Sequence, residues 1–177
     1  MLNFLLKHFR PDEFADSFTD ADYAALYNKG IRGLIFDIDN TLEGYEAEIP
    51  SQKTAGFLQS LIKTGFKICF VSNNNIKRIT KFNSTLNFPA IHKAGKPKKS
   101  AVYRAAKLMD VPINNIAIIG DQIFTDIFCG KRLGLHTILV EPVTSNDPWI
   151  VKIKRVPERI IVKYYKKQKS CAKGEEK

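Results

Sequence analysis

The chain has 177 residues, of which 44% are hydrophobic and 26% charged, with 28 Lys and Arg against 18 Asp and Glu. This length favours one domain, and the composition excludes collagen, coiled coils and a wholly disordered chain. No apolar run approaches the roughly 18–20 residues that cross a bilayer. The short apolar N-terminus has no basic start and no small-residue cleavage site. The sequence therefore predicts a cytoplasmic protein without a secretion signal or a transmembrane helix.

Apolar runs separated by turn residues predict alternating strands and helices. Strands are expected over 34–36, 67–71, 90–91, 116–119 and 137–140. Helices are expected over 20–29, 51–65, 75–86, 98–109 and 125–133. This alternation is typical of an α/β fold with a doubly wound, Rossmann-like parallel sheet and helices on both faces. Cys69 and Cys129 are expected in the core, because three widely spaced cysteines form neither a disulfide framework nor a zinc pattern.

The positive charge is concentrated in the C-terminal segment. Residues 148–177 carry ten Lys and Arg and three Glu, a net charge of +7, whereas residues 1–147 carry 18 basic and 15 acidic groups. The sequence therefore divides into a nearly neutral body, 1–147, and a basic arm, 148–177. Such an arm packs on the body, lies on an anionic membrane or binds nucleic acid, and these alternatives stay open at this stage.

Within the arm, Pro157 is expected to open a helix over 157–167. Its apolar residues would form one stripe, flanked by Lys and Arg: Ile160, Ile161, Tyr164 and Tyr165. The residues from Ser170 onward are expected to be frayed or disordered.

Polar residues gather where the predicted strands end. Ligands of an open parallel sheet bind beyond the carboxyl ends of its strands. The residues at these positions are Asp37, Asp39 and Thr41, then Ser72 and Asn73, then Lys96, then Asp121 and Asp126. Two carboxylates leaving one strand suit nucleophilic and acid–base work, and a carboxylate directly after a strand suits Mg²⁺. Each cluster alone is also explained by a turn, a helix cap or a solvated lysine. All four clusters together, in this order, favour a catalytic site.

The motifs Asp37-x-Asp39-x-Thr41, Ser72, Lys96 and Gly120-Asp121-x₄-Asp126 resemble those of the haloacid dehalogenase (HAD) superfamily of phosphohydrolases. The longer stretches around them, 36–42, 71–75, 120–126 and 132–140, look like the YqeG subgroup of its IIIA-type phosphatases. That subgroup is related to the mitochondrial phosphatidylglycerophosphate phosphatases. The resemblance spans about residues 1–165 and implies an HAD-like fold.

The resemblance also implies a role for each motif residue. Asp37 would be the nucleophile that forms an aspartyl-phosphate, and Asp39 the general acid and base. Mg²⁺ would be held by Asp37, the backbone carbonyl of Asp39, and Asp121, with Asp126 acting behind them. The substrate phosphate would be bound by Lys96 and by three smaller groups: Thr41, Ser72 and the Asn73 N–H.

The short spacing of the motifs leaves no room for a cap domain. Only ten residues, 42–51, separate the first motif from the next helix start, and 23 residues lie between Ser72 and Lys96. An uncapped site does little to surround a small molecule, so a large substrate is expected. Together with the basic arm and the family link, this favours phosphatidylglycerophosphate at a membrane surface, where the enzyme would bind peripherally.

Two alternatives remain open. The same chemistry would serve a phosphoprotein, a nucleotide or a sugar phosphate. In a different class, the chain would be an RNA- or ribosome-associated binding module with a vestigial site. Nucleic acid is the less favoured partner, because the arm carries few aromatic residues and no nucleic-acid motif is present.

Overall fold

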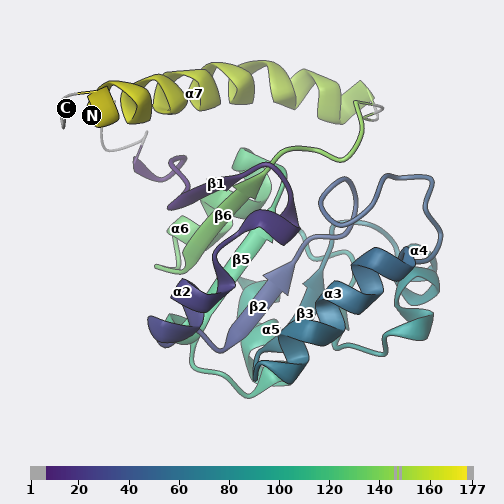
Figure 1. The fold of residues 1–177 in the computed structure, drawn as a ribbon. Coiled ribbons are helices and arrows are strands. Elements are labelled where there is room, and N and C mark those ends of the chain that lie inside the picture. Colours follow the sequence, from purple (N-terminus) through teal and green to yellow (C-terminus); the bar gives the residue numbers. More distant parts are fainter. Residues whose placement is uncertain (1–6, 146, 148, 175–177) are drawn as a thin grey trace.

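The computed structural model describes residues 7–145, 147 and 149–174. Its centre is one parallel sheet with the strand order β1-β6-β5-β2-β3-β4 (Figure 1). The strands are β1 (Glu13–Ala15), β2 (Gly33–Phe36), β3 (Lys67–Val71), β4 (Ala90–Ile91), β5 (Ile116–Gly120) and β6 (His136–Val140). In the register, Phe36 of β2 lies opposite Phe70 of β3 and Ile119 of β5. The five predicted strands and the doubly wound architecture are confirmed.

Helices cover both faces of the sheet. The α-helices are α2 (Tyr23–Asn28), α3 (Gln52–Lys63), α4 (Ile76–Phe82), α5 (Ser100–Met109), α6 (Phe128–Lys131) and α7 (Trp149–Gly174). Shorter helical turns are η1 (Phe18–Asp20), η2 (Asn83–Thr85), η3 (Ile113–Asn115) and the π-helical η4 (Ile123–Ile127). Side chains of α2, α3 and α4 pack with Phe36 and Phe70 on one face, whereas α5 and α6 pack with Ile35 on the other. Successive strand residues point to opposite faces, which is why adjacent residues join different layers.

Local signals explain several boundaries. Ser51 caps α3 by accepting a hydrogen bond from the Thr54 N–H at 3.2 Å, as expected. Gly65 follows that helix at φ +100°, a conformation that glycine adopts without strain. Cys69 and Cys129 are both buried, as predicted. No separate cap domain interrupts the described part of the chain, because the segments between the strands contain only the helices named above.

The sequence prediction missed one strand and placed two helices differently from the structure. The strand β1 has no counterpart in the sequence prediction. The helix expected over 125–133 is a π-turn, η4, followed by the four-residue α6. The helix expected over 157–167 begins at Trp149 and ends at Gly174, so Pro157 lies inside α7. The fraying expected from Ser170 onward stays a prediction. Residues 175–177 lie outside the described residues.

The predicted apolar stripe of the C-terminal helix is divided between two faces. Tyr165 is buried, and Ile161 packs in a small cluster with Ile123 and Leu139, so α7 is packed on the body. Ile160 and Tyr164, in contrast, are 67% and 49% exposed. In Figure 1, α7 runs across the edge of the sheet formed by β1 and β6.

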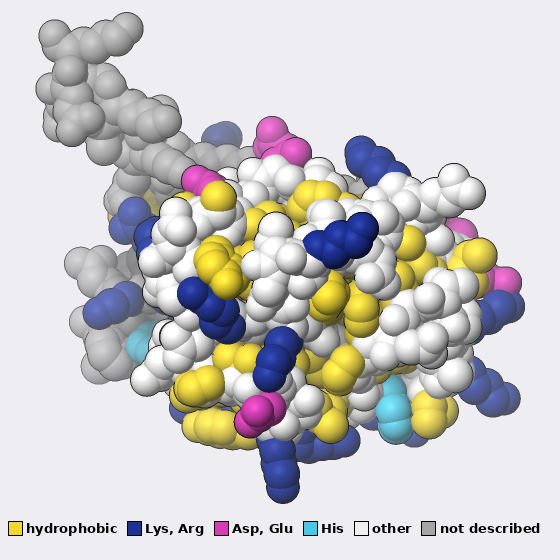
Figure 2. All heavy atoms as spheres, turned by 60° about the horizontal axis from the view of Figure 1, so that its bottom comes forward, with side chains coloured by type: hydrophobic (Ala, Val, Ile, Leu, Met, Phe, Trp, Pro, Cys, Tyr) yellow, Lys and Arg dark blue, Asp and Glu magenta, His cyan; other side chains and the backbone are white. Residues whose placement is uncertain are grey.

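The surface combines apolar and basic side chains. On the face drawn in Figure 2, hydrophobic and Lys or Arg side chains lie interspersed, and acidic ones are few. Basic residues are therefore not confined to α7. Within the described residues, no helix is both long and apolar enough to cross a membrane.

Candidate active site

The predicted site residues meet at the carboxyl edge of the sheet. Asp37 follows β2, Ser72 follows β3 and Asp121 follows β5, and these three strands are neighbours. Lys96, from the loop before α5, and Asp126, from η4, complete the cluster. All five residues are buried, with Lys96 only 6% exposed and Asp126 fully enclosed. The topology thus brings together residues that lie up to about 90 positions apart.

Lys96 is the cation at the centre of this cluster. Its Nζ lies 2.8 Å from Asp37 Oδ1 and 2.6 Å from Asp126 Oδ1. Both Asp126 oxygens are held by the protein, since Thr125 Oγ1 donates to Oδ2 at 3.0 Å. Lys96 thus occupies Asp37 Oδ1, while in the described part of the chain Asp37 Oδ2 accepts no hydrogen bond. One oxygen of the predicted nucleophile is fixed and the other is available.

Gly120 allows Asp126 to approach the end of β5. A Cβ atom at Gly120 would lie 2.4 Å from Asp126 Cγ, a separation that real side chains do not reach. The Gly120-Asp121 pair therefore has a packing reason in addition to its place in the motif. It lets the carboxylate of Asp126 lie beside the backbone that carries Asp121.

Burial and mutual repulsion shape the titration of the cluster. Burial raises the pKa of Asp37 well above its usual range; Lys96 opposes this rise, and the charges of Asp126 and Asp121 add to it. Burial likewise raises the pKa of Asp121 to about 6, against the opposing effect of Arg155. For Lys96, burial alone would lower the pKa, but Asp126 and Asp37 outweigh it, so the ammonium stays protonated. The cluster has an excess of negative charge that a further cation would relieve.

The predicted phosphate ligands surround this cluster. Ser72 is buried, and its Oγ accepts a hydrogen bond from the Asn74 N–H at 3.0 Å. The Asn73 side chain clamps the backbone of Lys96, accepting from its N–H at 2.7 Å and donating to its carbonyl at 3.2 Å. The Asn73 backbone N–H itself donates to no acceptor among the described residues. That donor is available to an anion, and its predicted contact with a phosphate stays a prediction.

Asp39 lies on the α4 side of the site, and the described residues show no hydrogen bond or ion pair between it and Lys96. Arg78 Nε donates to Asp39 Oδ1 at 3.0 Å. Asp39 Oδ2 receives hydrogen bonds from Asn74 Nδ2 at 3.1 Å and Ser72 Oγ at 3.4 Å. The two motif carboxylates thus have different hydrogen-bond partners.

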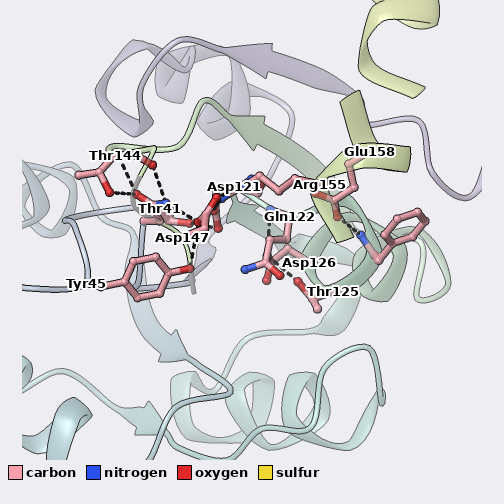
Figure 3. A network of polar contacts seen from close by, with 12 residues as sticks. Thr41, Tyr45, Asp121, Gln122, Thr125, Asp126, Thr144, Asp147, Arg155 and Glu158 are labelled. Atoms are coloured by element: carbon pink, nitrogen blue, oxygen red, sulfur yellow. Dashed lines mark hydrogen bonds and ion pairs between the residues drawn. The ribbon is translucent and has the colours of Figure 1, made fainter. Parts of the chain in front are cut away.

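Asp121 is held by two protein donors. Thr41, only 1% exposed, donates its hydroxyl to Asp121 Oδ1 at 3.1 Å. Thr41 therefore orients this carboxylate, and the phosphate contact expected from its motif position stays a prediction. Arg155 of α7 forms an ion pair with Asp121 Oδ2 and donates from Nη1 to the Asp121 carbonyl at 3.0 Å (Figure 3).

Asp147 extends this network to the loop after β6. Arg155 Nε lies 2.5 Å from Asp147 Oδ2, and Asn40 Nδ2 and Tyr45 OH donate to Asp147 Oδ1 at 2.8 and 3.3 Å (Figure 3). Asn40 is buried at φ +64°, a left-handed turn that Asn tolerates better than most residues. The network ties α7 to the loops that carry the motif aspartates.

The residues present fit a divalent cation that prefers oxygen. Asp37, Asp121 and Asp126 each offer a carboxylate oxygen, and these oxygens lie within 4.8 Å of one another. Mg²⁺ takes oxygen ligands and is commonly held by one or two carboxylates. Asp121 and Asp126 both have their two carboxylate oxygens engaged by protein donors, whereas Asp37 has Oδ2 available. Which of the three bind the metal directly stays a prediction.

A cavity of about 960 Å³ adjoins the cluster from the α7 side. Asp121, Asp147 and Arg155 line it, together with apolar residues of β1, β6 and α7. Asp37, Asp39 and Lys96 do not line it, so the cavity adjoins the cluster at Asp121 and not at the predicted nucleophile.

The sequence prediction missed Arg78, Asn74, Asp147 and Arg155. Asn74 lies directly after the second motif, and Arg78 follows it by one helical turn. Their spacing from Ser72 could therefore have predicted that both lie near the site. Arg155 gave no such signal, because it precedes Pro157 and lay outside the helix expected there. Asp147 was equally hidden, since it lies after the last predicted strand.

Comparisons with known proteins agree with this arrangement. A family model described as HAD-hydrolase-like matches residues 93–165, and one described as haloacid dehalogenase-like hydrolase matches residues 34–95. The chain is 36% identical over 164 residues to the probable phosphatase YqeG of Bacillus subtilis, covering 93% of this chain and 95% of that protein.

More distant similarity extends to two phosphatidylglycerophosphate phosphatases. Phosphatidylglycerophosphate phosphatase 1, chloroplastic, of Chlamydomonas reinhardtii is 26% identical, over 84% of this chain and 59% of that protein. The chloroplastic/mitochondrial enzyme of Arabidopsis thaliana is 27% identical, over 80% of this chain and 44% of that protein. This chain therefore spans about half the length of these two relatives.

Solved structures share the fold. An uncharacterized protein from Listeria monocytogenes serotype 4b superposes with a TM-score of 0.53 at 13% identity, over 66% of this chain and 84% of that one. The cobalt-bound deoxy-D-mannose-octulosonate 8-phosphate phosphatase of Haemophilus influenzae gives a TM-score of 0.52 at 14% identity, over 71% and 75%. The match to the probable phosphatase YqeG extends over nearly the whole of both chains. Together with the sheet order and the motif residues at its carboxyl edge, it shows that the chain belongs to the haloacid dehalogenase-like hydrolases and is a phosphatase of that family.

Proposed function

We propose that the protein hydrolyses a phosphomonoester through an aspartyl-phosphate on Asp37. The contact between Lys96 Nζ and Asp37 Oδ1, which leaves Oδ2 available beside a buried cation, carries this proposal. The carboxylate oxygen attacks phosphorus, the bond from phosphorus to the leaving oxygen breaks, and Asp39 gives that oxygen a proton. Asp39 then takes a proton from water, whose oxygen attacks phosphorus. The bond from phosphorus to the Asp37 oxygen breaks, which releases inorganic phosphate and restores the Asp37 carboxylate.

The neighbouring residues bind the phosphoryl group and position the carboxylates. Lys96, the Ser72 hydroxyl and the Asn73 N–H neutralise and orient the phosphoryl oxygens. Thr41 and Arg155 orient Asp121. Asp37, the backbone carbonyl of Asp39 and Asp121 would hold Mg²⁺, which offsets the negative charge shared by nucleophile and phosphate. Asp126 supports this set by holding Lys96 in place.

Phosphatidylglycerophosphate is the substrate we propose. Two relatives carry this activity in their names, and no cap domain surrounds the site in the described part of the chain. An amphiphilic substrate also suits the outer face of α7. Large apolar side chains between 49% and 70% exposed lie there, at Trp149, Ile153, Val156, Ile160 and Tyr164. At 100° per residue these five positions fall within about 80° of the helix circumference.

The inner face of the same helix is anchored. Arg155, Glu158 and Tyr165 are buried and lie on the opposite side of the helical circumference from the exposed stripe. Lys152, Arg159 and Lys163 are exposed beside the stripe. An apolar stripe bordered by cations is typical of a helix that lies on an anionic membrane, to which each cation contributes about 1 kcal/mol. We propose that α7 holds the enzyme at the surface that carries its lipid substrate.

The first experiment measures phosphate release from phosphatidylglycerophosphate in mixed micelles, with and without Mg²⁺, beside a generic aryl phosphate. Asp37→Asn is the inactive control. Metal-dependent release from the lipid that the variant abolishes is the expected result. Turnover of the aryl phosphate alone would keep the mechanism and refute the lipid substrate, leaving a phosphoprotein, nucleotide or sugar phosphate. No turnover of either would refute the mechanism.

A second experiment tests the membrane contact. The double variant Ile153→Gln/Ile160→Gln removes apolar surface from the outer stripe without touching the anchored face. We expect its sedimentation with anionic vesicles to fall about tenfold or more, since burying each such side chain is worth about 1.5–3 kcal/mol. Activity on the soluble ester should not change. Leu108→Gln, at an equally exposed position on α5, is the matched control. Unchanged vesicle binding by the double variant would contradict the proposal.

A further inference from the structure

Arg78 carries a buried donor that no described residue accepts. It lies in the first turn of α4, and its side chain is only 13% exposed. Nε donates to Asp39 Oδ1 at 3.0 Å and Nη1 to the Ala47 carbonyl at 2.5 Å. The third nitrogen, Nη2, is buried and has no hydrogen-bond partner among the described residues. A buried charged donor without a partner is costly, so its retention calls for an explanation.

The hydrogen bonds that Asp39 makes to other residues leave Arg78 Nη2 without an acceptor among the described residues. An arginine usually pairs with a carboxylate through two parallel hydrogen bonds. Here the second oxygen of Asp39 is already occupied by Asn74 Nδ2 and Ser72 Oγ. The Arg78–Asp39 pair is therefore single, and one arm of the guanidinium remains for another oxygen. The ring of Phe82, one turn later on α4, lies 5.3 Å from Arg78 Cζ and supports the side chain.

The position of Arg78 indicates which oxygen this is. In the proposed reaction, Asp39 protonates the leaving oxygen, so the leaving alcohol lies beside Asp39. Lys96, Ser72 and the Asn73 N–H are assigned to the phosphoryl oxygens. We propose that Arg78 Nη2 binds an oxygen of the leaving alcohol, a hydroxyl or a phosphodiester oxygen, and so selects polyol phosphates over simple alkyl phosphates. This inference rests on the proposed function and adds a specificity-determining residue to it.

A matched pair of soluble esters tests the inference. Glycerol 3-phosphate and n-propyl phosphate have leaving alcohols with the same carbon chain, and they differ in two hydroxyl groups. The wild-type protein should show a kcat/KM about 10- to 100-fold higher for glycerol 3-phosphate, the range expected for a hydrogen bond to a charged donor. Arg78→Met should remove most of this preference, by lowering kcat/KM for glycerol 3-phosphate far more than for n-propyl phosphate. Lys77→Met, an exposed cation on the same helix, should leave the preference unchanged.

Three outcomes would overturn the inference. If Arg78→Met lowers kcat/KM equally for both esters, Arg78 only positions Asp39. If the wild-type protein has the same kcat/KM for both esters, no leaving-group contact exists. This comparison needs only the wild-type protein, so it tests the inference even if Arg78→Met does not fold. Turnover of neither ester, nor of phosphatidylglycerophosphate, refutes the proposed function and this inference with it. Turnover without discrimination refutes the inference alone.

Discussion

Arg155 is the residue of α7 on which the polar cluster most depends, and Arg155→Met tests this directly. The Arg155 side chain is 9% exposed and pairs with two carboxylates, Asp121 and Asp147, whose side chains are 0% and 5% exposed. Methionine keeps much of the length and apolar volume of arginine but has neither the charge nor the donors. The substitution therefore leaves two buried carboxylates without their cation.

The expected loss of stability follows from these partners. Breaking a buried ion pair by removing one member costs about 3–5 kcal/mol. Asp121 keeps the hydrogen bond from Thr41, and Asp147 keeps those from Asn40 and Tyr45, so we expect the lower end, about 3 kcal/mol. For a chain of this size, each kcal/mol lowers Tm by about 2–4 °C, which gives a decrease of about 6–12 °C.

Thermal and urea unfolding of the metal-free protein measure this loss. Arg159→Met is the matched control, because it removes an exposed cation one turn further along the same helix and should change stability by less than about 0.5 kcal/mol. Added Mg²⁺ should raise the Tm of Arg155→Met more than that of the wild type, since the freed Asp121 oxygen becomes available to the metal. A Tm for Arg155→Met within about 2 °C of the wild type would refute the assigned role.

Three further results are expected. Because the pKa of Asp121 in the fold, about 6, lies above its unfolded value, the metal-free protein binds a proton more tightly when folded. Lowering the pH from 7 to 5 should therefore raise its free energy of unfolding, by about 1 kcal/mol from this group. Urea titrations in the presence of a chelator measure the free energy of unfolding at both pH values. An equal or lower value at pH 5 would contradict this expectation. Deleting residues 152–177 should abolish activity on vesicles and on a soluble aryl phosphate alike, because it removes the buried guanidinium as well as the outer stripe. A truncated protein that still hydrolyses the soluble ester would show that the arm serves only the membrane. Gly120→Ala should lower kcat/KM at least about tenfold, since its Cβ would displace Asp126 and thereby Lys96. Gly56→Ala in α3, where a Cβ meets nothing within 4 Å, should leave activity unchanged, and equal effects of the two substitutions would contradict the packing argument.

Much of the sheet and most of the site were predictable from the sequence. Strands buried on both faces are continuously apolar, so the apolar runs of β2, β3 and β5 predicted these strands. Parallel strands end at one edge, so the polar residues that follow them had to meet. The sequence alone therefore predicted that four residues lie close together, although it does not show where their side chains point: Asp37, Ser72, Lys96 and Asp121.

The strand β1 shows where local patterns stop. Its three residues, Glu13–Ala15, are all partly buried and show neither an apolar run nor a clear alternation. The segment is extended because β6 offers it a parallel edge, with Phe14 opposite Leu139. Asp12 secures the junction, since its carboxylate accepts from the Thr137 N–H and hydroxyl, both at 2.9 Å. These partners lie 125 positions away, so no window of sequence contains the signal.

The predicted start of the C-terminal helix was wrong for a related reason. Proline at the first helical position is a sound local rule, but here Pro157 lies well inside α7, where it costs about 3 kcal/mol. Tertiary contacts on both sides of it offset that cost: Arg155 binds Asp121 and Asp147, and Glu158 accepts a hydrogen bond from the Phe124 N–H at 2.9 Å. The helix therefore continues through the proline because its partners lie on the body.

The same contacts change how the charge of the chain is understood. Counted along the sequence, residues 148–177 form a basic arm attached to a nearly neutral body. In the fold, one of those cations is buried against the carboxylate that ends β5, where it balances part of the negative charge gathered by Asp37, Asp121 and Asp126. We infer that the division at residue 147 marks a change in composition and not a limit of the catalytic unit. A helix that contributes to the site on one face and exposes an apolar stripe on the other would bring the site and the membrane surface together.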